Sequence, residues 1–162
     1  MKQLTLLFLV RDKQILLAMK KRGFGAGRWN GVGGKLEAGE SVEQALVREC
    51  QEEIKVTPLM FGQAADITFD EMHLGERELL RVSVFLCSEW SGQPTETEEM
   101  SPDWFNINQI PYKDMWADDI FWLPRVLKGE KLVCKFTLDR NDKIADKHLR
   151  QVADFTNTKV SG

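Results

Sequence analysis

The segment Gly33–Val56 constrains this chain most, because its acidic residues fall where an amphipathic helix should face a core. The sequence SVEQ is typical of a capping box, with Ser41 at the N-cap and Gln44 three residues later, which predicts a helix beginning near Ser41. At about 100° per residue, Glu49 and Glu53 fall inside the apolar stripe of this helix, within about 20° of its first member. The members of the stripe are Val42, Ala45, Leu46, Cys50 and Ile54.

A third acid, Glu52, lies one ridge away from Glu49 on the predicted helix. A run of charges is usually a solvated face, but other residues already supply that face: Glu43, Gln44, Val47, Arg48 and Gln51. Carboxylates that converge near a core lose hydration and repel one another, so they require protons, arginines or a cation. Three carboxylates at positions i, i+3 and i+4 direct hard oxygen atoms at one volume, which favours Mg²⁺ or Mn²⁺.

The bulk properties restrict the class of protein. A length of 162 residues suits a single domain, residues 1–162, and the net charge of −3 does not favour binding to a nucleic acid polymer. The apolar run at residues 4–10 is too short to span a membrane and is expected to be a first strand. The cysteines, Cys50, Cys87 and Cys134, are odd in number and far apart, which indicates reduced thiols in a cytoplasmic protein. No feature requires more than a monomer.

The rest of the chain reads as alternating strands and loops with a second helix. Strands are expected at residues 4–10, 15–20, 66–69, 78–87, 103–107 and 131–139, with shaped or polar loops at 22–35 and 91–102. The second helix is expected at residues 118–129, where Pro124 would bend it. The chain after His148 is expected to fray, with residues 153–162 as a flexible tail.

The segment GKLEAGESVEQALVRECQEEIKV resembles the Nudix box, whose pattern is G-x5-E-x7-R-E-U-x-E-E-x-G-U. Lys55 departs from that pattern, because the family has glycine where the helix normally ends in a left-handed turn. The resemblance implies an α/β fold, the α/β/α sandwich with a mixed β-sheet, and Mg²⁺-dependent hydrolysis of a nucleoside diphosphate linked to another group. The residues that match in spacing are Gly34, Glu40, Arg48, Glu49, Glu52, Glu53 and Val56, and Cys50 takes the first bulky apolar place.

The same resemblance implies roles for the acids. Glu53 is expected to bind metal and to take the proton from the attacking water, while Glu40 and Arg48 form an ion pair that orients the cluster. A surface charge is the alternative for Glu40, and a solvated acidic loop is the alternative for Glu99. The implied metal ligands, for Mg²⁺ or Mn²⁺ as its substitute, are Gly33 through its carbonyl, Glu49, Glu52, Glu53 and, outside the box, Glu99.

Two flanking segments, MKKRGFGAGRWNG and PYKDMWADDIFW, resemble Nudix hydrolases that act on oxidised purine nucleoside triphosphates. Trp116 offers an aromatic face for a flat base, and Asp118 and Asp119 offer carboxylates for the hydrogen-bonding edge of that base. Core packing is the alternative for Trp116, and capping of the following helix is the alternative for one aspartate. If both aspartates are buried, they are expected to share a proton, because like charges raise one pKa. The further substrate-binding residues that the resemblance implies are Thr5, Lys20, Phe24, Asn30 and Phe69.

The implied activity is hydrolysis of 8-oxo-dGTP or 2-hydroxy-dATP to the monophosphate and pyrophosphate, which would cleanse the DNA precursor pool. Another Nudix substrate, such as O6-methyl-dGTP or ADP-ribose, is an alternative, and so is a non-catalytic Nudix module that senses a nucleotide. Such a sensor would be expected to lack box acids, and none is missing here. The stretch 70–79 is less similar to these hydrolases and would alter one wall of the pocket. No P-loop, HExxH or GxSxG motif is present, which argues against other hydrolase classes.

Overall fold

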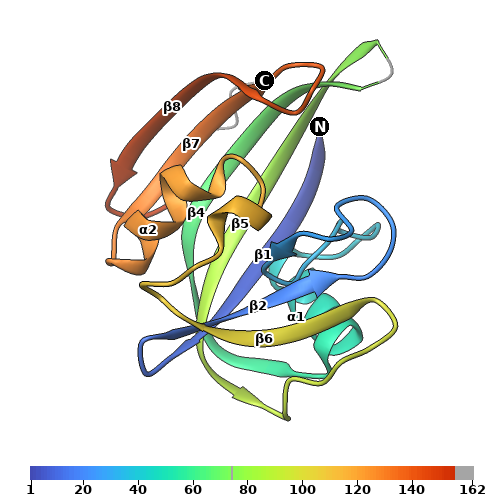
Figure 1. Ribbon diagram of the computed structural model, residues 1–162, viewed down its shortest axis with the longest axis vertical. Coiled ribbons are helices and arrows are strands. Elements are labelled where there is room, and N and C mark those ends of the chain that lie inside the picture. The colour runs from blue at the N-terminus through green and yellow to red at the C-terminus, as the bar shows by residue number, and fades with distance from the viewer. Residues whose placement is uncertain (74, 156–162) are drawn as a thin grey trace.

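A mixed sheet of eight strands organises the described part of the chain (Figure 1). The computed structural model describes residues 1–73 and 75–155, and within them the strand order is β3-β2-β1-β5-β4-β7-β8, with β6 paired to β2. In chain order the elements are β1 (Lys2–Arg11), β2 (Gln14–Lys20), β3 (Trp29–Asn30), α1 (Val42–Ile54), β4 (Thr57–His73), β5 (Glu76–Ser91), β6 (Met100–Asn106), the 3₁₀ turn η1 (Tyr112–Asp114), α2 (Asp119–Leu127), β7 (Lys131–Leu138) and β8 (Ile144–Val152).

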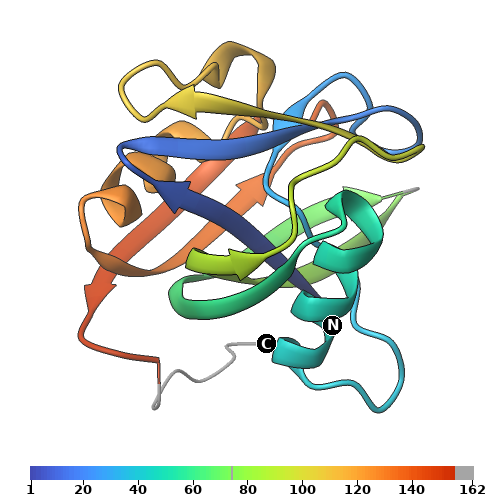
Figure 2. The same cartoon turned by 90° about the horizontal axis from the view of Figure 1, so that it is seen from below.

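Both parallel and antiparallel pairs build the sheet. β1 runs parallel to β5, and β4 runs parallel to β7, whereas β4 and β5 form a long antiparallel hairpin. β1 and β2 are joined by a tight turn in which Asp12 and Lys13 have φ of 52° and 63°, the left-handed conformation that two-residue hairpin turns demand. Viewed from below in Figure 2, β6 lies alongside β2, its antiparallel partner.

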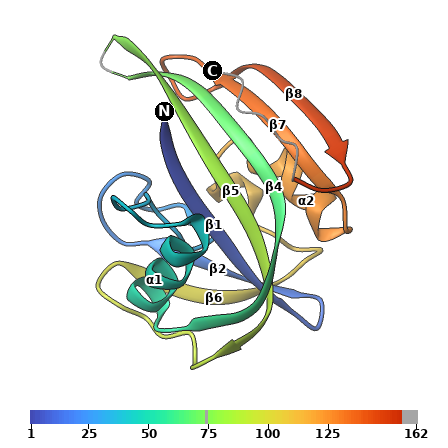
Figure 3. The ribbon, with the colours of Figure 1, turned by 180° about the vertical axis from the view of Figure 1, so that it is seen from behind.

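The two helices cover opposite faces of the sheet. α2 lies in front in Figure 1 and α1 lies in front in Figure 3, which is the view from behind. Successive residues of β1 enter the two cores alternately, because side chains of a strand alternate between its faces. Leu7 and Leu9 belong to the core beneath α1, while Phe8 packs in the other core, with its ring centroid 6.1 Å from that of Trp122 in α2. The expected α/β/α sandwich with a mixed sheet is confirmed.

The three cysteines are buried and free of disulfide bonds. Burial raises the pKa of Cys50 and of Cys134 to about 12, and it also raises the pKa of Cys87. In the described part of the chain, neither helix is long and apolar enough to cross a membrane.

Several strands extend beyond their expected ranges. β4 covers Thr57–His73 rather than 66–69 alone, because β5 and β7 pair with it on both sides. β6 begins at Met100, inside the expected loop 91–102, because it pairs with β2 from the Lys20–Met100 pair onward. The second helix has the expected position, with Pro124 inside it.

The C-terminal expectation is partly wrong. Residues 149–152 do not fray after His148; they pair with β7 as the end of β8. β8 is an edge strand with mostly exposed side chains, so it lacks the apolar alternation by which strands are recognised in a sequence. Of the expected tail, residues 156–162 lie outside the described residues.

Candidate active site

Both ends of α1 are defined by local hydrogen bonds. The Ser41 hydroxyl accepts from the Gln44 backbone N–H at 3.1 Å and the Gln44 side chain accepts from the Ser41 N–H at 2.9 Å, so the predicted capping box is confirmed. At the other end Lys55 adopts φ 61° and ψ 37°, its N–H donates to the Gln51 carbonyl at 3.1 Å, and the Val56 N–H donates to the Cys50 carbonyl at 3.4 Å. The helix therefore ends in the left-handed turn despite the missing glycine.

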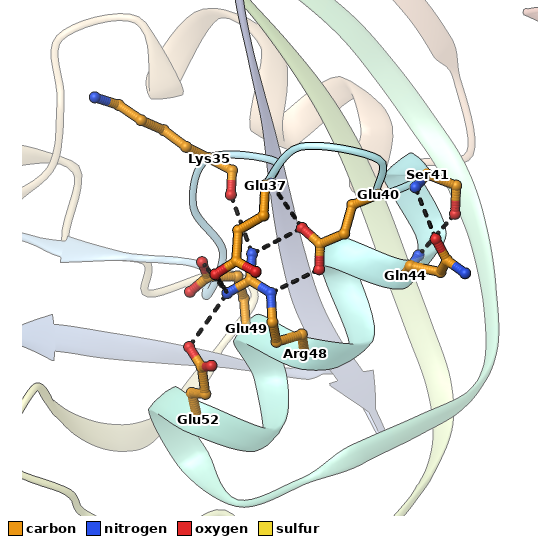
Figure 4. Close-up of polar contacts among 8 residues, drawn as sticks. All are labelled: Lys35, Glu37, Glu40, Ser41, Gln44, Arg48, Glu49 and Glu52. Carbon is orange, nitrogen blue, oxygen red and sulfur yellow. Dashed lines mark hydrogen bonds and ion pairs between the residues drawn. The ribbon is translucent and has the colours of Figure 1, made fainter.

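Arg48 is the centre of an ion-pair network on the flank of α1 (Figure 4). Its guanidinium donates two hydrogen bonds to Glu40, at 2.7 and 3.0 Å, and one to the Lys35 carbonyl at 3.1 Å. It also donates to Glu49 at 3.0 Å and to Glu52 at 3.3 Å. The two-point contact with Arg48 lowers the pKa of Glu40.

The helical-wheel assignment of Arg48 to the solvated face is wrong. Its side chain is only 22% exposed, because the loop that leads into α1 covers this flank of the helix and supplies Glu40 and the Lys35 carbonyl. The arrangement instead matches the ion pair that the family resemblance implied for Glu40 and Arg48.

Glu53 is a buried acid with one oxygen that no protein group satisfies. Its side chain comes from α1, the residue is 8% exposed, and Oε2 has no hydrogen-bond partner among the described residues. Burial raises the pKa of Glu53 to about 9, reinforced by a hydrogen bond and the charge of Glu49, while the Gly33 N–H opposes the shift. A free oxygen on a buried carboxyl beside a second carboxyl is the environment that a cation would complete.

Glycine is required where the loop meets these acids. A Cβ on Gly33 would lie 1.9 Å from the Thr5 carbonyl oxygen, and a Cβ on Gly34 would lie 2.6 Å from Glu49 Oε1. The backbone of this loop can approach both β1 and the carboxylates only because it carries no side chain there.

The remaining expected ligands are turned towards arginines. Glu52 is 59% exposed at its side chain and bonds to Arg48, while Glu99 accepts from Arg22 at 2.6 Å. These two acids line a common pocket of about 700 Å³ together with Glu49 and Glu53. Across residues 1–73 and 75–155, however, no three acidic, histidine or cysteine side chains converge closely enough to hold a metal ion. The expectation that Glu49, Glu52 and Glu53 point at one volume is not met in this arrangement, because Arg48 binds both Glu49 and Glu52. Arg22 likewise binds Glu99.

A second pocket, of about 280 Å³, adjoins the first. Trp116 lies at its wall, with Phe24 stacked on it at a centroid distance of 5.2 Å and the Arg28 guanidinium carbon 4.2 Å from the ring centroid. All eight expected substrate-binding residues line this pocket: Thr5, Lys20, Phe24, Asn30, Phe69, Trp116, Asp118 and Asp119. They come from distant parts of the chain, and the fold brings them together.

Asp118 and Asp119 are buried at 6% and 3% exposure. Burial raises the pKa of both groups, and the charge of Asp118 raises the pKa of Asp119 further. The Trp122 indole N–H donates to Asp118 at 2.8 Å, which opposes the upward shift of Asp118 and favours its ionised form. A proton shared by the pair therefore belongs on Asp119. Asp119 Oδ2 and the Thr5 hydroxyl are buried without hydrogen-bond partners among the described residues.

The capping alternative for these aspartates is wrong. Asp118 stands at the N-cap position of α2, but its side chain makes no capping bond and is engaged by Trp122 instead. Trp122 and Arg28 are site residues that the sequence analysis missed. Both lie within the two flanking segments, yet only the folded contacts with Asp118 and Trp116 distinguish them from core and surface residues.

An acid-lined pocket beside a base-sized pocket on this sandwich defines a class of nucleotide-binding protein, and comparison with known proteins gives its family. The NUDIX domain family model matches residues 1–126, so the chain belongs to the Nudix family.

Two relatives cover almost the whole chain. The "Oxidized purine nucleoside triphosphate hydrolase" of Danio rerio is 43% identical over 154 residues, 95% of this chain and 97% of that protein. The protein of the same name from Mus musculus is 41% identical over 151 residues, 93% of this chain and 96% of that protein. Among solved structures, a MutT protein from Bacillus halodurans superposes with a TM-score of 0.79 over 92% of this chain and 97% of its own, at 23% identity, which supports the fold.

Proposed function

We propose that this chain hydrolyses oxidised purine nucleoside triphosphates, with 8-oxo-dGTP and 2-hydroxy-dATP as substrates, to the monophosphate and pyrophosphate. The observation that carries the proposal is the buried Asp118–Asp119 pair, which faces a tryptophan-lined pocket that opens onto the carboxylates of α1. The names of the two near full-length relatives support the same substrate class. Such an activity removes damaged precursors before they enter DNA.

The base pocket suits an altered purine in particular. An ionised Asp118 accepts a hydrogen bond, whereas a protonated Asp119 can also donate one. The pair therefore offers both kinds of partner to the base edge, which explains how one pocket would admit both 8-oxoguanine and 2-hydroxyadenine. Asn30 adds an amide that donates and accepts, and Trp116 supplies an aromatic face.

Nudix hydrolases generally use a divalent metal, and we propose Mg²⁺ for this chain, with Mn²⁺ as a substitute. The buried, unpartnered Oε2 of Glu53 and the side-chain-free backbone at Gly34 fit such an ion, and carboxylates are the oxygen donors that Mg²⁺ prefers. When bound, the ion neutralises phosphate charge and acidifies a water molecule. The residues that would hold it are Glu49, Glu52, Glu53, Glu99 and the Gly33 carbonyl.

The protein's own groups supply the remaining chemistry. Glu53, which would be ionised when the cation is bound, would receive the proton of the attacking water, because it is the most buried of the α1 acids and has an oxygen available. Arg48 and Glu40 fix Glu49 from the outer side of the helix, so its carboxylate keeps one orientation. Lys20 lines both pockets and would face the phosphates of the bound nucleotide.

The other Nudix activities fit less well. ADP-ribose does not need a buried carboxyl pair at its adenine, whereas O6-methyl-dGTP has an altered purine edge and belongs in the same substrate panel. A non-catalytic sensor has no need for the full set of box acids that this chain retains. We further propose that the chain is one domain, acts as a monomer in the cytoplasm and binds no nucleic acid polymer; its three unpaired buried thiols support a reducing compartment.

A substrate panel tests the proposal. Pyrophosphate release with Mg²⁺ is measured from 8-oxo-dGTP, 2-hydroxy-dATP, O6-methyl-dGTP, dGTP and ADP-ribose. We expect kcat/KM for the oxidised nucleotides to exceed that for dGTP by about 10-fold or more, since one further charged hydrogen bond is worth that factor. A chelator should abolish the reaction. Equal rates on dGTP, or turnover of ADP-ribose alone, would contradict the proposed substrate class.

The role of Glu53 is tested by Glu53→Gln. Glutamine keeps the size of the side chain but cannot take the proton, so kcat should fall by about 10²- to 10⁴-fold while 8-oxo-dGMP still binds. Turnover is followed by pyrophosphate release and binding by calorimetry. A kcat close to the wild-type value would remove Glu53 from the reaction.

A further inference from the structure

The junction between the two pockets has its own chemistry. In a nucleoside triphosphate the sugar joins the base to the phosphates, so a nucleotide with its base beside Trp116 and its phosphates beside Glu53 must place its sugar where the two pockets meet. The residues that line both pockets mark this place. In the part of the chain that the structure describes, those shared residues are glycine or apolar except for Lys20 and Glu71.

The two charged residues at the junction face different partners. The positive charge of Lys20 acts to lower the pKa of Glu53 and of Glu99. Its ammonium group therefore lies near these two acids, on the side of the junction where the phosphates would bind. Glu71 lies on the same face of β4 as Ile67 and Phe69, which precede it by four and two residues, and all three line the base pocket. Its carboxylate therefore extends the wall of the base pocket towards the acids of α1.

The hairpin of β4 and β5 positions Glu71. β1 begins its pairing with β5 at Lys2 and Leu80, and the hairpin continues past this point, beside the N-terminal end of β1 (Figure 3). Glu71 pairs across the hairpin with Glu78, which in turn forms an ion pair with Lys2. The pKa of Lys2 is raised, mainly by its hydrogen bond to Glu78 and to a smaller extent by the charge of Glu71. The ammonium of Lys2 thus offsets part of the negative charge that Glu71 and Glu78 bring to the wall of the acid-lined pocket.

We propose that Glu71 is a specificity-determining residue that accepts hydrogen bonds from the sugar hydroxyls of the bound nucleotide. This inference rests on the proposed function, because it assigns the sugar of the same substrate. A carboxylate has two oxygens and can accept from the 2′- and 3′-hydroxyls of a ribose together, whereas a deoxyribose offers only the 3′-hydroxyl. Glu71 therefore adapts the site to oxidised ribonucleotides, such as 8-oxo-GTP, in addition to deoxyribonucleotides. It belongs to the stretch 70–79, in which the sequence is less similar to the resembled hydrolases.

The test compares three sugars on one base. Values of kcat/KM are measured for 8-oxo-GTP, 8-oxo-dGTP and the 2′,3′-dideoxy form of 8-oxo-GTP, with wild-type protein, Glu71→Ala and Glu71→Gln. For Glu71→Ala we expect a loss of about 10-fold or more with 8-oxo-GTP, a smaller loss with 8-oxo-dGTP, and a change of less than about twofold with the dideoxy form. Glu71→Gln, which keeps one neutral acceptor, should lie between Glu71→Ala and wild type.

The dideoxy nucleotide has no sugar hydroxyl, so any loss of activity on it reports damage to the fold or a change in local electrostatics rather than lost recognition of the sugar. Equal losses on all three sugars, or an unchanged ratio of 8-oxo-GTP to 8-oxo-dGTP, would overturn the assignment. Glu76→Gln is the matched control, because it removes one negative charge from an exposed position on the same hairpin that lines neither pocket. The wild-type rate on 8-oxo-dGTP tests the proposed function by itself, whereas the variant ratios test Glu71 alone.

Discussion

At the scale of single residues, the site depends on carboxyl groups that the fold removes from water. Glu53 and Asp119 each carry an oxygen that is buried and unpartnered among the described residues, and burial raises the pKa of both. Groups of this kind lower the stability of a protein unless they bind a proton or a ligand. Their presence in adjoining pockets indicates that the molecule keeps them for binding and chemistry.

The raised pKa of Glu53 predicts how stability depends on pH without metal. The folded protein holds this proton up to about pH 9, whereas the unfolded chain loses it near the ordinary value of 4.5. The free energy of unfolding should therefore fall as pH rises through this window and level off above it. Melting temperatures with a chelator, for wild type and Glu53→Gln, provide the measurement. The same slope in both proteins would show that Glu53 does not cause it.

The aspartate pair predicts a change of substrate ranking. Asp119→Asn removes the titrating proton but keeps a donor, so the ratio of kcat/KM for 8-oxo-dGTP to that for 2-hydroxy-dATP should shift by about 10-fold, with its pH dependence reduced. The Mg²⁺ concentration for half-maximal rate should stay the same. Asp114→Asn, at an exposed position in η1, serves as the control. An unchanged ranking would remove Asp119 from base recognition.

At the scale of elements, α1 shows which features a sequence can reveal. Its capping box and its apolar stripe depend on residues a few positions apart, so local spacing predicts them. The environment of Arg48 depends on the preceding loop, and β8 depends on an edge position, so neither follows from local spacing. Glu71 was missed for the same reason: its place at the junction of two pockets is set by a hairpin and by β1.

The left-handed end of α1 predicts a stabilising substitution. Lys55 has a positive φ of 61°, a conformation that costs a residue with a Cβ about 1 kcal/mol relative to glycine. Lys55→Gly should therefore raise the melting temperature by about 2–4 °C in a chain of this length. Lys55→Ala, which keeps the Cβ, should give no such gain. A melting temperature that is lower for Lys55→Gly than for Lys55→Ala would contradict this account of the helix end.

At the scale of the whole molecule, β1 joins the two cores and the two pockets. Its residues alternate between the core under α1 and the core under α2, while Thr5 reaches the base pocket. The motif spacing in the sequence indicated the acids and the base-binding residues separately. The fold brings together residues that lie more than one hundred positions apart in the sequence, such as Thr5 and Trp116. This proximity follows from the order of the strands in the sheet, which local spacing does not reveal.

The double role of β1 predicts that its interior residues dominate stability. Phe8 is fully buried and packs on Trp122, so Phe8→Ala should lower the free energy of unfolding by about 3–5 kcal/mol. Met60→Ala, at a side chain that is 56% exposed, should change it by less than about 0.5 kcal/mol. Chemical denaturation measures both. A small effect for Phe8→Ala would contradict the inference that Phe8 anchors β1 in the core under α2.

The burial of the three thiols has a consequence for a protein that acts on oxidised nucleotides. Oxidised nucleotides accumulate where peroxide and related oxidants are abundant, and the same oxidants attack cysteine in its thiolate form. With the pKa of Cys50 and Cys134 raised to about 12, these thiols stay protonated and enclosed at neutral pH. We therefore expect the thiols of this protein to resist oxidation, so that treatment with peroxide should leave all three cysteines reduced in the folded protein.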